Sequence, residues 1–282
     1  MKSAERRLIR TGHDMEKKRL DLILVERGLA ESRTAAQRII MAGEVRVNGN
    51  MTIKPSVPVS ETDAVTVDRG PRFVSRGGEK LAGALEAFQL DDLSGLTCVD
   101  VGSSTGGFTD CLLQHGAAKV YAIDVGYGLL HWKLRQDGRV VVMEKTNARD
   151  VKGFPEPVRL TVVDASFISL KIMLPVIRGW FGAGDGMVLA LIKPQFEAGR
   201  EEAARGAGVI RDPAVHRRVL DEILAFATES GWGVGGLVRS PLKGPKGNTE
   251  FFVRLTTKAR AADRGRLIRE AMRAERKADS GL

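Results

Sequence analysis

Short apolar runs alternate with amphipathic segments along most of the chain after residue 96. These runs predict strands buried on both faces of a parallel sheet, and they lie at 97–101, 120–123, 139–143, 158–163 and 187–192. Two more strands are expected, at 233–238 and 250–255. Helical patterns separate the strands. One helix is expected at 79–88, one should be broken or ended at Pro175, and a long one should begin at Asp212-Pro213 and run to Glu229. The alternation predicts an α/β fold.

A smaller unit of different pattern precedes the α/β region. Leu20, Ile23 and Leu24 share one face of a short helix that Gly28 ends. Ser32 is a candidate N-cap for a second helix. Alternating residues at 45–49 and 64–67 predict two paired strands. The pattern indicates a small α+β domain.

Composition shifts mark the boundaries between segments. Residues 1–16 are charged and are expected to be disordered, with Met15 as an alternative start. A glycine- and arginine-rich stretch is expected to be a linker. The stretch 197–212 is expected to be a mobile loop over a substrate, and the charge-dense end of the chain is expected to be a solvated helix or disordered. The expected segments are a terminus (1–16), an N-terminal domain (17–67), a linker (68–78), an α/β domain (79–257) and a tail (258–282).

The first strand of the α/β region ends in a glycine-rich turn, GSSTGG, which leads into a helical pattern. Glycines let the backbone approach a ligand, and the following helix offers unpaired N–H groups. The spacing Gly-x-x-x-Gly-Gly differs from the dinucleotide fingerprint, and Asp100 precedes the first glycine. An acid there suits the ammonium group of S-adenosylmethionine better than a pyrophosphate. An ordinary β–turn–α junction without a ligand is the alternative.

A second acid strengthens the prediction of a cofactor site. Asp124 ends the next strand, about twenty residues past the glycines, where an acid accepts hydrogen bonds from ribose hydroxyls. Asn147, Arg149 and Asp150 follow the third strand, and any one of them could contact adenine. The predicted cofactor-binding residues are Asp100, Gly102, Ser103, Ser104, Thr105, Gly106, Gly107, Phe108, Asp124, Asn147 and Asp164.

The net charge of +9 favours a polyanionic partner. Aromatic residues make up 5% of the chain, so phosphate contacts are a more obvious mode of binding than stacking. The two cysteines indicate a reducing compartment and packing roles, and the four histidines do not cluster into a metal site. No apolar run is long enough to span a bilayer and no secretory signal is visible, so a cytoplasmic location is expected.

The N-terminal domain resembles the small RNA-binding domain first known from the fourth protein of the small ribosomal subunit. The matching residues are Arg19-Leu20-Asp21, Ser32-Arg33, Ala42-Gly43 and Val45-Val47-Asn48-Gly49. The resemblance implies that Arg19, Arg33, Arg38 and Arg46 contact the RNA backbone, and Arg76 of the linker is a further candidate. A solvated basic face without a partner is the alternative.

Charged residues lie at the expected carboxyl ends of the strands, where parallel sheets bind ligands. Asp164 follows the fourth strand and Lys193 the fifth. Glu250 begins the last strand, so it reaches the same edge only if that strand is antiparallel, as in the seven-stranded methyltransferase arrangement. Lys80, in the first turn of its helix, opposes the helix dipole and is therefore not placed there for helix stability.

These motifs make a family resemblance specific. SRGGEKL, DVGSSTGGFTD, DASFIS, LIKPQFE and KGNTEFF resemble the TlyA group of ribosomal RNA 2′-O-methyltransferases, which have an FtsJ-like catalytic domain. The resemblance implies a Rossmann-like S-adenosylmethionine-dependent domain and a catalytic tetrad of Lys80, Asp164, Lys193 and Glu250. It also implies cytidine as the target, in ribosomal RNA within ribosomal subunits. The same group has been labelled haemolysin.

The chemistry of ribose methylation requires such residues. A 2′-hydroxyl is a poor nucleophile until it loses its proton, and a lysine accepts a proton only where its surroundings destabilise the ammonium. Lys193 is predicted to accept or stabilise that proton, Asp164 to orient Lys193, and Lys80 with Glu250 to position the ribose. Asp164-Ala-Ser-Phe replaces the Asn/Asp-Pro-Pro-aromatic turn of amino-group methyltransferases, and the Pro-Cys nucleophile of cytosine-carbon methylation is missing.

Three other functions are considered. A non-catalytic RNA-binding or assembly factor would be expected to lack part of the tetrad. A small-molecule methyltransferase would not need the basic N-terminal domain. A cytolysin would need an export route that the N-terminus does not show. The sequence leaves the oligomeric state open.

Overall fold

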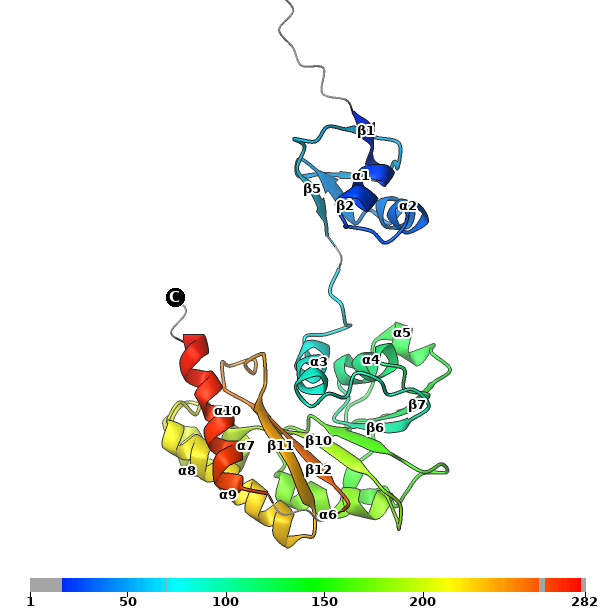
Figure 1. The fold of residues 1–282 in the computed structure, drawn as a ribbon. Helices are drawn as coiled ribbons and strands as arrows, with labels where there is room; N and C mark the ends of the chain where they lie inside the picture. The colour runs from blue at the N-terminus through cyan, green and yellow to red at the C-terminus, as the bar shows by residue number, and fades with distance from the viewer. Residues whose placement is uncertain (1–16, 69, 259–261, 280–282) are drawn as a thin grey trace, which may run out of the picture. The chain divides into compact units, whose positions relative to one another are not determined.

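The computed structural model describes residues 17–68, 70–258 and 262–279, and the chain divides into two compact units between residues 71 and 72 (Figure 1). The predicted disorder of residues 1–16 lies outside the described residues. The second unit begins inside the stretch predicted as linker, because Phe73 is buried in its core and helix α3 (Gly77–Ala87) starts before residue 79. The expected linker 68–78 was therefore too long at its C-terminal end.

The first unit contains two helices and two small sheets. Its core lies between α1 (Leu20–Glu26), α2 (Arg33–Met41) and strands β2 (Val45–Val47) and β5 (Val65–Val67). The two strands pair as predicted, and they run antiparallel. The Ser32 hydroxyl accepts a hydrogen bond from the amide of Ala35, which confirms the predicted cap. The remaining strands are β1 (Lys18–Arg19), β3 (Asn50–Thr52) and β4 (Pro58–Val59).

The second unit is built on one seven-stranded sheet of order β11-β12-β10-β9-β6-β7-β8. Neighbours among β6 to β10 pair parallel, and β12 pairs antiparallel with both β10 and β11. The last strand thus has the orientation that brings Glu250 to the carboxyl edge. The strands are β6 (Thr97–Val101), β7 (Lys119–Ile123), β8 (Val140–Met143), β9 (Leu160–Val163), β10 (Met187–Ile192), β11 (Gly233–Arg239) and β12 (Phe251–Thr256).

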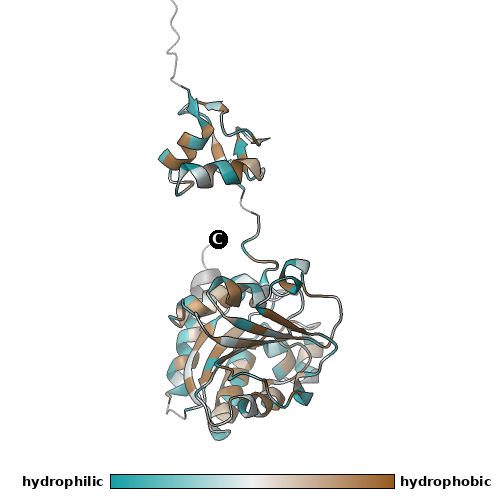
Figure 2. Cartoon of the chain, turned by 90° about the vertical axis from the view of Figure 1, so that its right-hand side faces the viewer, coloured by the Kyte–Doolittle hydropathy of each residue, from teal (hydrophilic) through white to brown (hydrophobic). Residues whose placement is uncertain are grey.

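Helices cover both faces of this sheet (Figures 1 and 2). Alternate strand residues belong to two cores, one on each face. Val99 and Val101 face the core under α6, α9 and α10, while Cys98 faces the core under α3, α4 and α5. Both cysteines are buried and free. The helices not yet bounded are α4 (Gly107–Gln114), α5 (Trp132–Arg135), α6 (Leu170–Trp180), α7 (Pro194–Glu197), α8 (Arg200–Arg205), α9 (Pro213–Glu229), α10 (Arg264–Asp279) and the 3₁₀ turn η1 (Ala148–Asp150).

Three local predictions differ from the structure in whole or in part. Helix α6 continues through Pro175, because its buried residues Met173, Leu174 and Ile177 hold it against the sheet. The tail forms a helix, α10, as one of the two expectations had it, but this helix buries Ile268 and Ala271 and packs against α9 and β11. The stretch 197–212 contains helix α8 and is held by buried Asn248, which accepts from the Ile210 amide and donates to the Gly208 carbonyl.

Candidate active site

The glycine turn follows β6, and its three glycines have different roles. Gly102 has φ +82°, and a Cβ there would lie 2.9 Å from the Asp164 carbonyl oxygen. A Cβ at Gly106 would meet the Leu134 side chain at 2.2 Å, and one at Gly107 would lie 2.8 Å from the Gly78 amide nitrogen. Gly106 and Gly107 therefore let α4 pack closely against α5 and α3, and the contact of these two glycines with a cofactor stays a prediction.

Two adjoining pockets lie at the carboxyl edge of the sheet. The larger has a volume of about 620 Å³ and is lined by the ends of β6 and β7 and by the loops after β8 and β9. The smaller, about 220 Å³, lies against the start of α3 and the loop before β12. Gly102, Ser104 and Asp164 line both pockets. Most of the predicted cofactor residues line one or both: Gly102, Ser103, Ser104, Thr105, Gly107, Phe108, Asp124, Asn147 and Asp164.

Asp124 joins the turn to the loop after β7. One carboxylate oxygen accepts a hydrogen bond from the Ser104 amide at 2.8 Å, and the other accepts from the Gly126 amide at 2.7 Å. A carboxylate oxygen has further lone pairs, so Asp124 can still accept bonds from a diol in the larger pocket. Asn147 lines the same pocket and caps the short helix η1 through its bond from the Arg149 amide.

Asp100 is fully buried and lines neither pocket. Its Oδ2 accepts a 2.7 Å hydrogen bond from the Thr109 hydroxyl, which ties β6 to α4. Burial, together with the nearby carboxylates of Asp164 and Asp124, raises the pKa of Asp100 to about 7. The Asp100 side chain faces the core between the sheet and α4. This position therefore does not support the expected direct contact with a ligand.

The four residues of the predicted tetrad form two ion pairs. Lys193 Nζ lies 2.6 Å from Asp164 Oδ1 and donates to the Ser166 hydroxyl at 3.0 Å. Lys80 Nζ donates to Glu250 Oε2 at 2.7 Å. Lys80 and Lys193 are only 9% and 8% exposed, and Glu250 is buried. Lys80 and Asp164 line the smaller pocket, so each pair contributes a charged group to it.

Two contacts connect the elements that carry these pairs. Gln195, which follows Lys193 on α7, donates to Glu250 Oε1 at 3.2 Å and so links the neighbourhoods of the two pairs. A Cβ at Gly244 would lie 2.5 Å from Glu250 Oε1, so the loop before β12 packs directly on this carboxylate. Both contacts restrict where the Glu250 side chain can lie.

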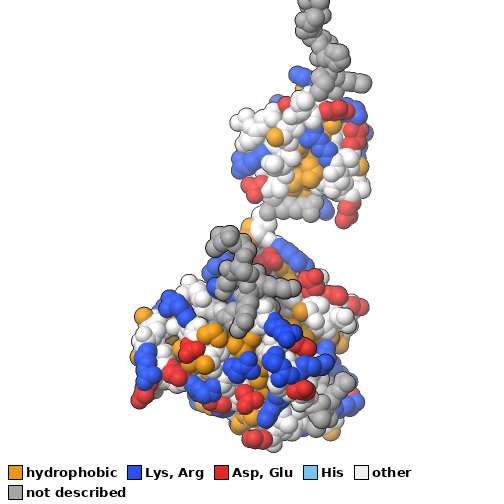
Figure 3. All heavy atoms as spheres, turned by 60° about the vertical axis from the view of Figure 1, so that its left-hand side comes forward, with side chains coloured by type: hydrophobic (Ala, Val, Ile, Leu, Met, Phe, Trp, Pro, Cys, Tyr) orange, Lys and Arg blue, Asp and Glu red, His pale blue; other side chains and the backbone are white. Residues whose placement is uncertain are grey.

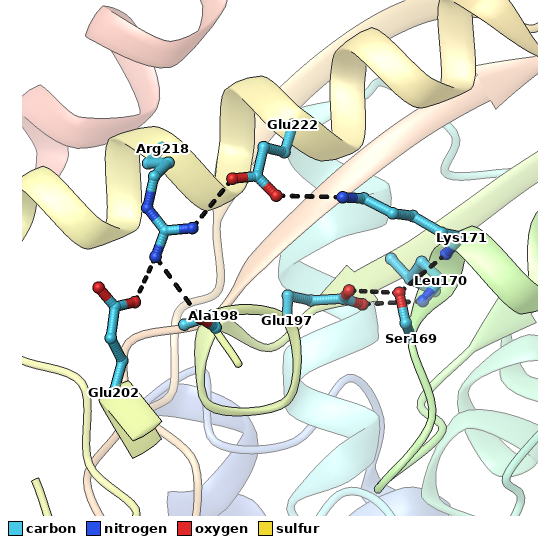
Figure 4. Close-up of polar contacts among 8 residues, drawn as sticks. All are labelled: Ser169, Leu170, Lys171, Glu197, Ala198, Glu202, Arg218 and Glu222. Atoms are coloured by element: carbon cyan, nitrogen blue, oxygen red, sulfur yellow. Dashed lines mark hydrogen bonds and ion pairs between the residues drawn. The ribbon is translucent and has the colours of Figure 1, made fainter. Parts of the chain in front are cut away.

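Glu197 is a further residue of the site that the sequence analysis missed. Its carboxylate accepts from the Ser169 hydroxyl at 2.6 Å and from the Leu170 amide at 2.8 Å, so it joins α7 to the start of α6 (Figure 4). Burial raises the pKa of Glu197. The contact ties the Asp164 loop to the Lys193 loop, and its place in the KPQFE and DASFIS motifs was the only sequence signal.

A chain of ion pairs surrounds the Glu197 contact (Figure 4). Glu222 of α9 pairs with Lys171 at 3.0 Å and with Arg218 at 2.9 Å. Arg218 also pairs with Glu202 of α8. These pairs tie helices α6, α8 and α9 together behind the strand-end loops.

Phe167 was also missed. It follows Asp164 in the DASFIS motif, lines the larger pocket, and is 88% exposed. Its backbone has φ +64°, which is uncommon for a residue with a side chain, and its ring lies 4.8 Å from that of Phe196. The local structure therefore holds an aromatic face at the mouth of the site.

In the first unit, buried Asp21 organises part of the predicted RNA surface. It accepts from Arg19 at 3.0 and 3.1 Å, from Arg33 at 3.0 Å and from Gln37 at 2.9 Å. The Arg19 guanidinium is the largest of the causes that hold the pKa of Asp21 well below its usual range. Arg19, Arg33, Arg38 and Arg46 all remain exposed to solvent.

Arg76 has a different place from the other predicted RNA contacts. It belongs to the second unit, directly precedes α3 and lines the smaller pocket. From this position Arg76 can contact a substrate in the smaller pocket, and it is not part of the predicted RNA-binding surface of the first unit.

Basic and acidic side chains are mixed on the face of the second unit in Figure 3.

Among residues 17–68, 70–258 and 262–279, no group of three His, Cys, Asp or Glu side chains is arranged to hold a metal. No helix in these ranges is both long and apolar enough to cross a membrane.

The sheet order, the antiparallel β12 and the pockets at the turn after β6 define an α/β methyltransferase. A model described as FtsJ-like methyltransferase matches residues 73–257, and one described as S4 domain matches residues 18–65. The chain belongs to the FtsJ-like methyltransferase family, carries an N-terminal S4 domain, and uses S-adenosylmethionine as its cofactor.

Named relatives match nearly the whole chain. The 16S/23S rRNA (cytidine-2′-O)-methyltransferase TlyA of Mycobacterium tuberculosis is 48% identical over 245 residues, covering 85% of this chain and 90% of the relative. Hemolysin A of Brachyspira hyodysenteriae is 42% identical, covering 83% and 98%. A solved structure described as a candidate hemolysin from Streptococcus thermophilus is 39% identical, covers 94% of this chain and 99% of its own, and has a TM-score of 0.68.

The residues at the two pockets fit S-adenosylmethionine. Asp124 offers acceptors for the ribose hydroxyls, and Gly102, which has no side chain, lines both pockets. The Ser103 hydroxyl is buried, lines the smaller pocket and has no hydrogen-bond partner among the residues that the structure describes. A buried hydroxyl without a partner is costly, so a bound polar group would satisfy it.

Proposed function

We propose that the chain methylates the 2′-hydroxyl of a cytidine ribose in ribosomal RNA. The TlyA relative supports the substrate by its name, and the S4 domain supports an RNA partner. The observation that carries the proposal is the pair of buried lysine–carboxylate contacts, Lys193–Asp164 and Lys80–Glu250, at the edge where the pockets lie.

S-adenosylmethionine, when bound, supplies an electrophilic methyl group. Asp124 would hold its ribose, and the backbone of the 102–107 turn would hold its amino acid end. Phe108 lines the same smaller pocket as this turn. Asn147 lies where it could contact the adenine. These residues leave Lys80 and Asp164 on the other wall of the smaller pocket for the substrate ribose.

Lys193 is proposed to take or stabilise the proton that leaves the 2′-hydroxyl. Asp164 and Ser166 fix the direction of its amine, which is the requirement for proton transfer in a defined geometry. Lys80, held by Glu250, is proposed to position the ribose. The exposed ring of Phe167 is proposed to contact the base, because aromatic faces stack on nucleobases.

The first unit is proposed to bind the RNA backbone. Arg19 and Arg33 are oriented by Asp21, and Arg38 and Arg46 add charge. Phosphate contacts position a protein but carry little sequence information. We therefore propose that assembled or partly assembled ribosomal subunits in the cytoplasm are methylated in preference to short naked RNA.

The test is to incubate ribosomal subunits and free ribosomal RNA with labelled cofactor and to map positions resistant to alkaline cleavage. Label on a cytidine 2′-oxygen is expected, with more label on subunits than on short naked RNA. Label on a base, or none on any RNA, would contradict the proposed function. Equal labelling of short naked RNA would contradict only the preference for subunits.

The name of the Brachyspira relative supplies a second candidate, lysis of erythrocytes. Incubation of washed erythrocytes with the purified chain tests it directly. Haemoglobin release by wild type and by Lys193→Ala alike would establish an activity separate from methyl transfer. No release at any concentration would remove the candidate.

A further inference from the structure

One loop of the second unit exposes large rings that the pockets and cores do not use. Tyr127 is 71% exposed and Trp132 is 59% exposed, and neither lines the two pockets described above. Of the three tryptophans, Trp180 and Trp232 are buried. Exposure of two large rings close together in one segment is unusual for a surface without a binding role.

The loop that carries these rings is held in place. Glu144 accepts from the amides of Gly128 at 2.9 Å, Leu129 at 3.1 Å and Leu130 at 3.3 Å, and it pairs with Arg135. Arg135 is the largest of the causes that lower the pKa of Glu144 to about 2, so the carboxylate stays charged. These contacts hold the backbone that carries the two rings, so the exposure of the rings does not come from a loose loop.

Each ring is accompanied by an amine. Lys145 Nζ lies 4.2 Å from the centre of the Tyr127 ring, and Lys133 Nζ lies 5.9 Å from the Trp132 ring. Both lysines are exposed. An aromatic face beside a cation is the combination that binds unpaired nucleic acid, since the ring stacks on a base and the amine neutralises a phosphate. A hydrophobic protein partner would not need the two amines.

The loop also borders the cofactor site. Val125 and Leu129 line the larger pocket, and the His131 amide donates to the Thr105 carbonyl of the glycine turn at 3.1 Å. This loop therefore lies in the same unit and at the same edge of the sheet as the tetrad, where the target ribose of an RNA strand would bind.

We propose that Tyr127, Trp132, Lys133 and Lys145 form a platform that binds unpaired nucleotides of the RNA next to the target. The inference rests on the proposed RNA substrate and extends it with a second RNA surface outside the S4 domain. Bases stack on Trp132 and Tyr127, and the two lysines contact the intervening phosphates.

Trp132 is the exposed tryptophan and so reports on this platform. The full chain is mixed with an unpaired oligoribonucleotide, or with the same sequence in a duplex, and acrylamide quenching of tryptophan fluorescence is measured. The single strand is expected to protect Trp132 from quenching and the duplex is not. Trp132→Leu should remove the accessible emission and weaken single-strand binding about tenfold.

Two lysine variants provide a matched comparison. Lys133→Gln should lower the slope of log affinity against log salt by about 0.7, the value for one lost phosphate contact on a single strand. Lys152→Gln changes an exposed lysine that is not one of the four platform residues, and it should leave the slope unchanged. Undiminished quenching of Trp132 with RNA bound, or equal slopes for both variants, would overturn the proposal.

Methyl transfer is read separately in Lys193→Ala. Protection of Trp132 by single-stranded RNA in this variant supports the platform whatever the methylation assay shows. Methylation of ribosomal RNA without any protection of Trp132 would leave the proposed function in place and refute the platform.

Discussion

Each unit of the molecule contains buried carboxylates held by cations, and the two arrangements differ in where the cations lie. In the S4 domain the carboxylate of Asp21 is buried, while Arg19 and Arg33 reach solvent. In the methyltransferase domain Lys80 and Lys193 are themselves buried, and one member of each ion pair, Lys80 or Asp164, lines the smaller pocket. Exposed cations held by a buried acid suit phosphate binding, whereas buried ion pairs beside a pocket suit chemistry on a bound group.

The largest expected effect is the loss of Lys193. Lys193→Ala should lower the rate of methyl transfer by about 10²- to 10⁴-fold, the usual contribution of a positioned proton acceptor. Cofactor affinity, measured by calorimetry, should change little because Lys193 lines neither pocket. A rate that stays within a few-fold of wild type would show that another group moves the proton.

Breaking the second pair should act on stability as well. Glu250→Gln leaves the buried Lys80 amine without its charged partner, so the free energy of unfolding should fall by about 3–5 kcal/mol. The double variant Lys80→Met with Glu250→Gln should recover part of the loss in denaturant titrations. Equal stability of wild type and Glu250→Gln would mean that the pair is solvated.

Asp100 gives a pH-dependent prediction. Its folded pKa, about 7, lies above the ordinary value, so the folded state holds more protons than the unfolded state between about pH 4 and 7. Asp100 therefore makes stability fall as pH rises through this window. Urea midpoints at several pH values should show a shallower fall in Asp100→Asn than in wild type. Identical slopes would contradict the assigned burial effect.

The smallest expected effect concerns one exposed arginine of the S4 domain. Arg38→Gln should weaken RNA binding modestly and lower the salt slope by about 1, with no change in rate at saturating RNA. Filter binding at several salt concentrations measures this. Lys152→Gln is the charge-matched control, and a rate defect that saturating RNA does not correct would place Arg38 outside the binding surface.

Much of this architecture was readable from the sequence because a charged residue directly follows three of the parallel strands. Asp124, Asp164 and Lys193 follow apolar runs, and parallel strands bring such ends to one edge. The antiparallel β12 was a condition for Glu250 and is what the structure shows. The Ser32 cap and the start of α9 after Asp212 were likewise predicted from local signals.

The misses come from packing that the sequence pattern does not contain. The sequence did not show that Gly106 and Gly107 also allow neighbouring helices to approach, or that the Asp100 side chain is buried although it precedes the first glycine. Helix α10 carries many charges, yet Ile268 and Ala271 are buried and Leu267 and Met272 pack against the same core. A low aromatic fraction disfavoured stacking surfaces, but it could not show that the few rings present at 127 and 132 would be exposed.

The most direct test of the contrast between the two units compares single-turnover methyl transfer by Lys193→Ala and by Arg33→Ala as RNA is raised to saturation. The account predicts that saturating RNA restores the rate of Arg33→Ala and leaves Lys193→Ala at its reduced rate. Restoration of both variants, or of neither, would contradict the assignment of binding to the exposed cations and chemistry to the buried ones.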